Sequence, residues 1–314
     1  MLKYIFKRTT GAVVSLFIIV SLIFILLRLM PIEGYLGENY EKLSADVVES
    51  QLREKGLLDP VPVQLFKFYK NLFKGDLGTS WIYREGYPIT KILEKKIPVS
   101  LKLGLISLGV SLIVGIPLGA MMARTKGKLG DKIGTAFIAI VEALPGAVLL
   151  LFVQLYLSKT LSLPMLFDKK NPVSYILPVF SISLLSISGY AMWMRRYMID
   201  NINMDYVKLA IAKGVSSRRI MMQHVFRNAF VPMVQFLPGS VLSTIIGSIY
   251  VEHLYSIPGT GGLLVDVIQR QDNTMVQALV IIYSAIGIVG MFVGDLLMAL
   301  LDPRISFTKK GDDR

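Results

Sequence analysis

Six apolar stretches, each long enough to cross a lipid bilayer, constrain the fold of this 314-residue chain more than any other feature. A helix needs about 20 apolar residues to span the roughly 30 Å of hydrocarbon in a membrane. More than half of all residues are apolar, which exceeds what a soluble domain of this length needs. The sequence therefore predicts an all-α integral membrane protein with six transmembrane helices. The stretches are Thr10–Met30, Pro98–Ala123, Gly134–Leu157, Tyr175–Met194, Pro232–Val251 and Val276–Leu300.

Rare residue types exclude several kinds of site. The chain contains no cysteine, which rules out disulfides and thiolate metal or redox centres. Its two histidines, His224 and His253, lie far apart in the sequence, so a zinc or histidine-dependent catalytic site is poorly supported. An excess of Lys and Arg can indicate nucleic-acid binding, but in a membrane protein it more often reports topology.

The positions of the basic residues predict how the chain is oriented. Lys3, Lys7 and Arg8 precede the first stretch, which is longer than a signal-peptide core and lacks a small-residue cleavage site. We therefore expect a retained signal anchor with a cytoplasmic N-terminus. The loop after the second stretch and residues 195–231 are basic, whereas residues 31–97 contain ten basic and ten acidic residues. The positive-inside rule then places both termini and the two basic loops in the cytoplasm of a cell-membrane protein, without any nucleic acid.

This topology divides the chain into four expected regions. They are the cytoplasmic N-terminus with the first transmembrane helix (1–30), an extracytoplasmic helical loop (31–97), the transmembrane core (98–300) and a cytoplasmic tail (301–314).

Two helices are expected within the extracytoplasmic loop. Capping signals bound the first between Ser44 and Gly56, and the second runs from about Pro62 to Gly75. The second helix carries aromatic and Lys side chains together. It therefore lies either at the membrane interface or against the protein's own transmembrane helices.

The connection between the fourth and fifth stretches is the most informative segment. Residues from about Met204 have helical composition up to Gly214, which suits a left-handed helix end. Ser216 or Ser217 can begin a second helix, and Pro232 then opens the fifth stretch. A basic helix–turn–helix between two transmembrane helices suits the docking of a soluble partner. It suits contact with anionic lipid headgroups equally well.

This segment resembles the coupling loop of ATP-binding-cassette (ABC) importer permeases in its peptide-permease form. The family pattern is Asp-Tyr-(Val/Ile)-x-x-Ala-x-Ala-Lys-Gly, a basic stretch, and His-x-x-(Arg/Lys)-Asn-Ala-x-x-Pro. The general loop begins with Glu-Ala-Ala, whereas residues 208–210 read Lys-Leu-Ala, which favours the peptide branch over the sugar and amino-acid branches. The matching residues are Asp205, Tyr206, Ala210, Ala212, Lys213, Gly214, His224, Arg227, Asn228, Ala229 and Pro232, with Arg218 and Arg219 in the basic stretch.

Other segments resemble the same family in order and spacing over nearly the whole chain. They are Gly-Asp-Leu-Gly-Thr-Ser at 75–80, Ile-Pro-Val-Ser-Leu at 97–101, an extracytoplasmic turn at 252–262 and Leu-Asp-Pro-Arg at 301–304. The turn is represented by Glu252, Pro258, Gly259 and Gly262. Together these motifs are similar to the B-type transmembrane subunits of the oligopeptide, dipeptide and nickel permease family.

The resemblance implies a type I ABC importer. Two permease subunits, this chain and a similar partner, would enclose the path, and two cytoplasmic ATPases would bind the coupling loops. An extracytoplasmic binding protein would deliver the solute. Residues 204–230 would dock an ATPase, with Gly214 as the pivot. The chain lacks a Gly-x-x-x-x-Gly-Lys-(Ser/Thr) phosphate loop, so we expect no enzymatic activity and no cofactor here, with ATP and Mg bound by the ATPases.

Small and polar side chains recur at helical spacing in the fifth stretch. They would either line a solute path or make contacts between helices. Glu142, in the third stretch, is the deepest ionisable residue and would face a cavity or pair with another helix. The candidate path residues are Gln235, Ser240, Ser243, Thr244 and Glu142.

Two other functional classes have weaker support. An ion-coupled secondary transporter would usually carry more titratable groups within its transmembrane helices. An intramembrane enzyme would need a catalytic motif such as Gly-x-Ser-x-Gly or His-Glu-x-x-His, and the sequence has neither. Within the importer family, peptides are the expected solutes, with nickel chelates or oligosaccharides as alternatives.

Overall fold

The structure, a computed structural model, describes residues 2–30, 33–36 and 42–301. Within these residues the regular structure is helical, apart from an isolated antiparallel bridge between Thr79 and Pro88. The expected tail motif at 301–304 lies, beyond Leu301, outside the described residues. The prediction of an all-α protein is confirmed.

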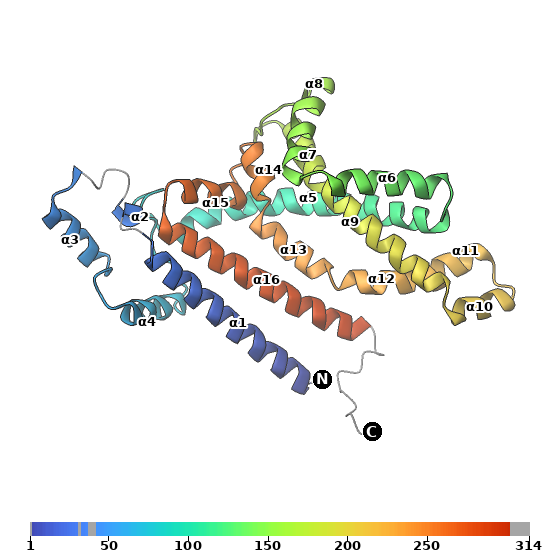
Figure 1. Ribbon diagram of the computed structural model, residues 1–314, viewed down its shortest axis with the longest axis horizontal. Coiled ribbons are helices and arrows are strands. Elements are labelled where there is room, and N and C mark those ends of the chain that lie inside the picture. The colour runs from blue at the N-terminus through green and yellow to red at the C-terminus, as the bar shows by residue number, and fades with distance from the viewer. Residues whose placement is uncertain (1, 31–32, 37–41, 302–314) are drawn as a thin grey trace.

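The helices follow one another along the chain as Figure 1 shows. They are α1 (Leu2–Arg28), α2 (Glu33–Leu36), α3 (Ala45–Glu54), α4 (Val61–Leu72), α5 (Ile89–Arg124), α6 (Leu129–Ala143), α7 (Gly146–Phe152), α8 (Ser158–Thr160), α9 (Ile176–Ile202), α10 (Asp205–Ala212), α11 (Ser217–Arg219), α12 (Arg227–Val234), α13 (Leu237–Ile246), α14 (Ile249–Leu254), α15 (Thr260–Gln269) and α16 (Asn273–Leu301). π-Helical turns occupy Val153–Leu157 and Ile220–Phe226, and a 3₁₀ turn occupies Pro172–Tyr175.

Four described helical segments are long and apolar enough to cross a membrane without a break. They contain α1, α5, α9 and α16. Two further segments are bent pairs: α6 with α7–α8, bent by 108°, and α11–α12 with α13–α14, bent by 42°. If each bent pair is one span, the described chain has six spans, the number predicted from the sequence.

The third expected transmembrane helix, Gly134–Leu157, is wrong as a continuous helix. α6 ends at Ala143 because Pro145 disfavours helical backbone at the residue before it, and Leu144 is extended with ψ 136°. α7 then leaves at a steep angle, toward the top of Figure 1. Apolar periodicity cannot reveal this bend, since both arms are equally apolar.

Two expected helix starts at proline are also wrong. α5 begins at Ile89, inside the region assigned to the extracytoplasmic loop, and contains Pro98. Pro232 lies inside α12, which begins at Arg227 and continues past the proline without a break. The actual break lies at Gln235 and Phe236, and Pro238 occupies the first turn of α13, where its missing N–H costs no helical hydrogen bond.

α5 and α9 pack closely against each other, because two glycines of α5 lie next to α9. A Cβ on Gly115 would lie 2.9 Å from Tyr190 Cβ. A Cβ on Gly119 would contact the carbonyl oxygen of Ala191 and lie 2.8 Å from Met194 Cβ. Small residues at such positions allow two backbones to approach closely.

Both expected extracytoplasmic helices are present, as α3 and α4. α4 packs against α1: the Tyr69 and Phe17 rings stack with centroids 5.0 Å apart, and the Tyr69 hydroxyl donates to the Phe17 carbonyl at 3.0 Å. This geometry favours packing on the protein's own helices over an interface-only position. Phe66 within α4 and Phe73 directly after it nevertheless remain exposed.

Candidate functional site

Residues 204–230, which we call the coupling segment, fold as helix, turn and helix. They lie at the far right end of the molecule in Figure 1. α10 ends in a Schellman motif, in which the Gly214 N–H donates to the Ile211 carbonyl and the Val215 N–H to the Ala210 carbonyl. Gly214 has φ +71°, a left-handed conformation that glycine adopts without strain. The expected helix end is therefore confirmed. Ser216 stands at the N-cap of α11, but its side chain makes no capping hydrogen bond.

One face of this coupling segment is anchored in the protein. Val207, Ala210, Ile220, Val225 and Ala229 are buried in a cluster with residues of α5 and α9. The cluster ties the helix–turn–helix to the ends of two transmembrane helices.

The opposite face of the coupling segment is exposed. Leu209 and Ile211 expose 57% and 61% of their surface, and Lys208, Lys213, Arg218 and Arg219 are exposed in the same segment. Exposed apolar side chains often mark a surface that binds another molecule. Of the expected coupling residues, Ala210 is buried and His224 is half-buried; the exposed ones are Asp205, Tyr206, Ala212, Lys213, Gly214, Arg218, Arg219, Arg227 and Asn228.

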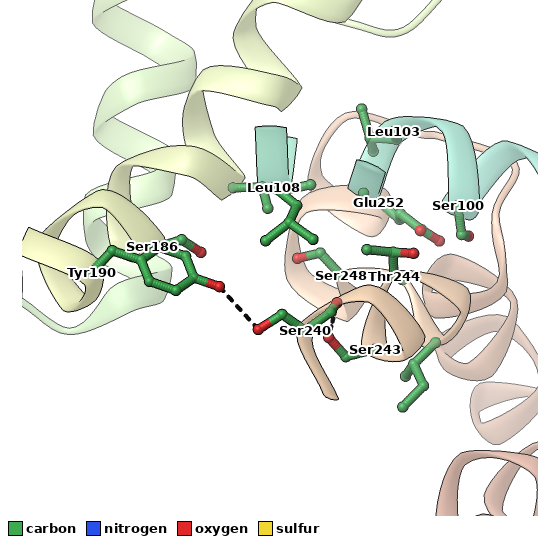
Figure 2. A pocket seen from close by; sticks show the side chains of 14 residues that line it. Ser100, Leu103, Leu108, Ser186, Tyr190, Ser240, Ser243, Thr244, Ser248 and Glu252 are labelled. Atoms are coloured by element: carbon green, nitrogen blue, oxygen red, sulfur yellow. Dashed lines mark hydrogen bonds between the residues drawn. The ribbon is translucent and has the colours of Figure 1, made fainter. Parts of the chain in front are cut away.

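A cavity of about 330 Å³ lies among α5, α9, α13 and α14 (Figure 2). Its lining is rich in hydroxyl groups, which both donate and accept hydrogen bonds. Glu252 is the one carboxylic acid among the described residues that line it. The hydroxyl-bearing lining residues are Ser100, Ser186, Tyr190, Ser240, Ser243, Thr244 and Ser248.

The sequence-derived path residues divide into two groups. Ser240, Ser243 and Thr244 line the cavity, as Figure 2 shows. Gln235 and Glu142 do not. The Gln235 amide donates to Asp295 of α16 at 3.2 Å, and Glu142 accepts a hydrogen bond from the Ser188 hydroxyl of α9 at 2.9 Å. These two residues connect helices instead.

Glu252 holds the expected turn in place. Its Oε2 atom accepts hydrogen bonds from the backbone N–H groups of Gly261 (2.7 Å) and Gly262 (3.1 Å), in the first turn of α15. Such N–H groups lack partners within their own helix, and a carboxylate suits the positive end of the helix dipole. Glu252 Oε1 has no hydrogen-bond partner among the described residues and is packed against Gly247.

The rest of the turn connects to α5. Pro258 and Gly259 lead into α15, and the Gly259 N–H donates to the Ile257 carbonyl at 2.8 Å. The Thr260 N–H then donates to the Ser100 hydroxyl at 2.8 Å. Of the turn residues, Glu252 alone lines the cavity, a role that the sequence analysis does not anticipate.

Sequence reasoning also missed the α9 contribution to the cavity, which comes from Ser186 and Tyr190. A signal was present, because the apolar α9 carries serines at 181, 183, 186 and 188. Polar residues inside a transmembrane helix usually face a cavity or another helix. Which of the two each serine faces depends on helix rotation, which only the tertiary structure shows.

Comparison with known proteins divides the chain into two matched regions. Residues 115–307 match the family described as binding-protein-dependent transport system inner membrane component. Residues 1–102 match the N-terminal component of the membrane subunit of the same transport systems. The chain belongs to this permease family. The family consists of transporter subunits that are not catalytic and bind no cofactor themselves.

Several relatives of this permease align over nearly their full length. The dipeptide transport system permease of Lactococcus lactis subsp. cremoris is 31% identical over 305 residues, which cover 97% of this chain and 99% of that protein. Oligopeptide transport system permeases of Haemophilus influenzae and Bacillus subtilis are 30% and 31% identical, each alignment covering 98% of this chain and 100% of the relative. The permease is an ABC importer subunit of the oligopeptide and dipeptide permease group.

A solved structure supports the fold. The crystal structure of an amino acid ABC transporter with histidines superposes with a TM-score of 0.53 at 17% identity, covering 69% of this chain and 95% of that one. The permease is therefore a multi-pass inner membrane protein of a binding-protein-dependent transporter. Such a transporter works with ATPase and binding-protein partners.

Proposed function

We propose that this permease forms the translocation path for dipeptides or oligopeptides. In the proposed complex it pairs with a second, homologous permease, two cytoplasmic ATPases and an extracytoplasmic binding protein. One observation carries the proposal: α9, which leads into the coupling segment, and α13, which follows α12 out of it, also carry the hydroxyl-lined cavity. A surface that docks an ATPase is thereby joined directly to a candidate path.

Docking is assigned to the exposed face around Leu209 and Ile211. The exposure of two large apolar side chains in a segment that also carries exposed arginines and lysines supports a protein partner rather than lipid headgroups alone. The buried face of the segment then transmits ATPase closure to α9 and α12. The proposed topology has both termini and this segment in the cytoplasm, with residues 31–97 on the outside.

Substitution of Gly214 tests the coupling role. Because nothing lies within 4 Å of a Cβ at this position, a new side chain meets no neighbour and only the left-handed backbone opposes it. Gly214→Val should strain the turn by about 1–2 kcal/mol, lower co-purification of the ATPases and abolish uptake. Gly214→Asn is the matched control, since asparagine tolerates left-handed backbone, and it should retain both. Full uptake by a stably folded Gly214→Val complex would contradict the coupling role.

Reconstitution tests the solute. The complete complex in proteoliposomes, supplied with its binding protein and ATP, should accumulate labelled di- or oligopeptides. The cavity supports this class, because serine and threonine hydroxyls match the neutral donors and acceptors of a peptide main chain. Uptake of a nickel chelate or an oligosaccharide, with no peptide uptake, would overturn the assignment. Uptake without ATP would overturn the importer mechanism itself.

A further inference from the structure

A second hollow adjoins the hydroxyl-lined cavity. It has a volume of about 280 Å³ and shares Ser186 and Tyr190 with the cavity. Its other lining residues are Gly189, Trp193, Met233 and Phe236, so its walls are largely apolar. We refer to the first hollow as the hydroxyl cavity and to the second as the apolar pocket.

The two hollows lie along the same helix faces. On α9, positions 186, 190 and 193 follow helical spacing and pass from the hydroxyl cavity to the apolar pocket. Along α13 and α12, Thr244 and Ser240 line the hydroxyl cavity, and Phe236 and Met233 line the apolar pocket. Facing stripes of α9 and α12–α13 thus form one continuous track, whose chemistry changes part-way along.

A hydrogen bond between helices marks this change. The Tyr190 hydroxyl donates to Ser240 Oγ at 2.9 Å, which Figure 2 shows as the dashed line between α9 and α13. Ser240 Oγ in turn donates to the Phe236 carbonyl at 3.0 Å, next to the break between α12 and α13. Gly115 of α5 lies next to the base of the Tyr190 side chain, since a Cβ at Gly115 would lie 2.9 Å from Tyr190 Cβ.

We propose that Tyr190 and Ser240 form a latch between the hydroxyl cavity and the apolar pocket, which must open for a solute to pass. The inference rests on the proposed role of the cavity as the path. α9 ends at Ile202, where the coupling segment follows it, and α12 begins at Arg227 and continues the chain out of that segment. Movement of that segment therefore reaches both sides of the latch. The break between α12 and α13 allows α13 to shift relative to α12. Such a shift would separate Ser240 from Tyr190.

Thiol labelling tests the latch without knowledge of the solute. The chain has no cysteine, so Ser243→Cys places one thiol in the hydroxyl cavity. The complete complex, without ATP, is labelled with a membrane-impermeant maleimide in vesicles that expose the coupling segment. Tyr190→Phe keeps the ring and removes the hydroxyl, and should raise the labelling rate several-fold. Ser240→Ala should do the same.

The double variant distinguishes a latch from two separate effects. Because both changes break the Tyr190–Ser240 hydrogen bond, the double variant should label no faster than Ser240→Ala alone, which also loses the bond to the Phe236 carbonyl. Tyr250→Phe is the control: Tyr250 is exposed and lines neither hollow, so labelling should not change. Unchanged labelling in both single variants, or fully multiplicative rates in the double variant, would overturn the latch.

Failure of the latch and failure of the proposed function give different results. If the labelling rates rise as expected but no peptide enters proteoliposomes, the latch stands and the solute assignment fails. If peptide uptake is normal and labelling never changes, the latch fails and the solute assignment stands. Should Tyr190→Phe assemble poorly, Ser240→Ala alone decides, because loss of the small hydroxyl leaves packing almost unchanged.

Discussion

A single buried acid, Asp272, controls how the loop before α5 folds. Its carboxylate accepts hydrogen bonds from Ser80 Oγ at 2.6 Å and from the N–H groups of Ile82 (3.0 Å) and Tyr83 (2.9 Å). Burial raises the pKa of Asp272, but these hydrogen bonds, with one from Thr274, outweigh burial and hold its pKa below the ordinary value. The partners lie about 190 positions away in the sequence, so no local pattern could predict them.

Asp272→Asn should therefore lower stability in a pH-dependent way. The amide loses charge-assisted hydrogen bonds that are worth about 1.5–3 kcal/mol each, partly recovered by its remaining oxygen. Because the folded pKa lies below that of the unfolded chain, the wild-type advantage is complete at neutral pH. It is lost as the pH falls through the folded pKa. In detergent, the unfolding temperature of the variant should lie well below that of the wild type at pH 7, and this difference should narrow below about pH 4.

Asp205→Asn is the control for this measurement. The Asp205 side chain is 96% exposed, so its loss should leave the unfolding temperature unchanged at both pH values. An equal gap for Asp272→Asn at neutral and acid pH would show that the buried charge contributes nothing specific.

The close contact of α5 with α9 is also decided at single residues. Gly119→Ala places a methyl group against the Ala191 carbonyl, and should destabilise the bundle by roughly 1–3 kcal/mol through overpacking. Gly109→Ala, in the same helix, meets nothing within 4 Å and should be neutral or slightly stabilising. Unfolding temperatures of the two variants in detergent make the comparison. Equal values would contradict the packing argument.

At the scale of elements, α4 is held to the bundle by few contacts. The Tyr69 hydroxyl is hydrogen-bonded to Ser21 and to the Phe17 carbonyl, and the Phe68 ring packs on Phe24 at 5.3 Å between centroids. The sequence correctly placed this helix but left its contact surface open. Aromatic and basic residues are compatible with both a lipid interface and a protein neighbour, so only the packing distinguishes them.

Tyr69→Ala should release α4 from α1. Loss of the ring stacking and both hydrogen bonds removes most of the contact, so amide hydrogen exchange in residues 61–72 should accelerate while α5 and α9 stay protected. Phe66→Ala is the matched control, because that ring is 71% exposed and its removal should not loosen α4. The same acceleration in both variants would show that α4 is held by something other than Tyr69.

At the scale of the whole molecule, the number and direction of crossings depend on whether each bent pair is one span. Lys126 and Lys169 are exposed in the loops before α6 and after α8. If α6 with α7–α8 is one span, these loops lie on opposite sides of the membrane. In the cysteine-free chain, Lys169→Cys should react with an impermeant maleimide in intact cells. Lys126→Cys should react only after permeabilisation. Labelling of both in intact cells would exclude the proposed topology.

The sequence alone determined the class of protein, the approximate spans and the helix–turn–helix between the fourth and fifth of them. Each depends on residues near one another in the chain: an apolar run, a cluster of basic residues, or a helix that ends at Gly214. The tertiary structure decided the bends, the cavity and the partners of each polar side chain. Ser100, Tyr190 and Ser240 come from three helices, and they line one cavity because of how those helices are rotated and packed. Their meeting depends on close packing between helices, which periodicity along one helix does not record.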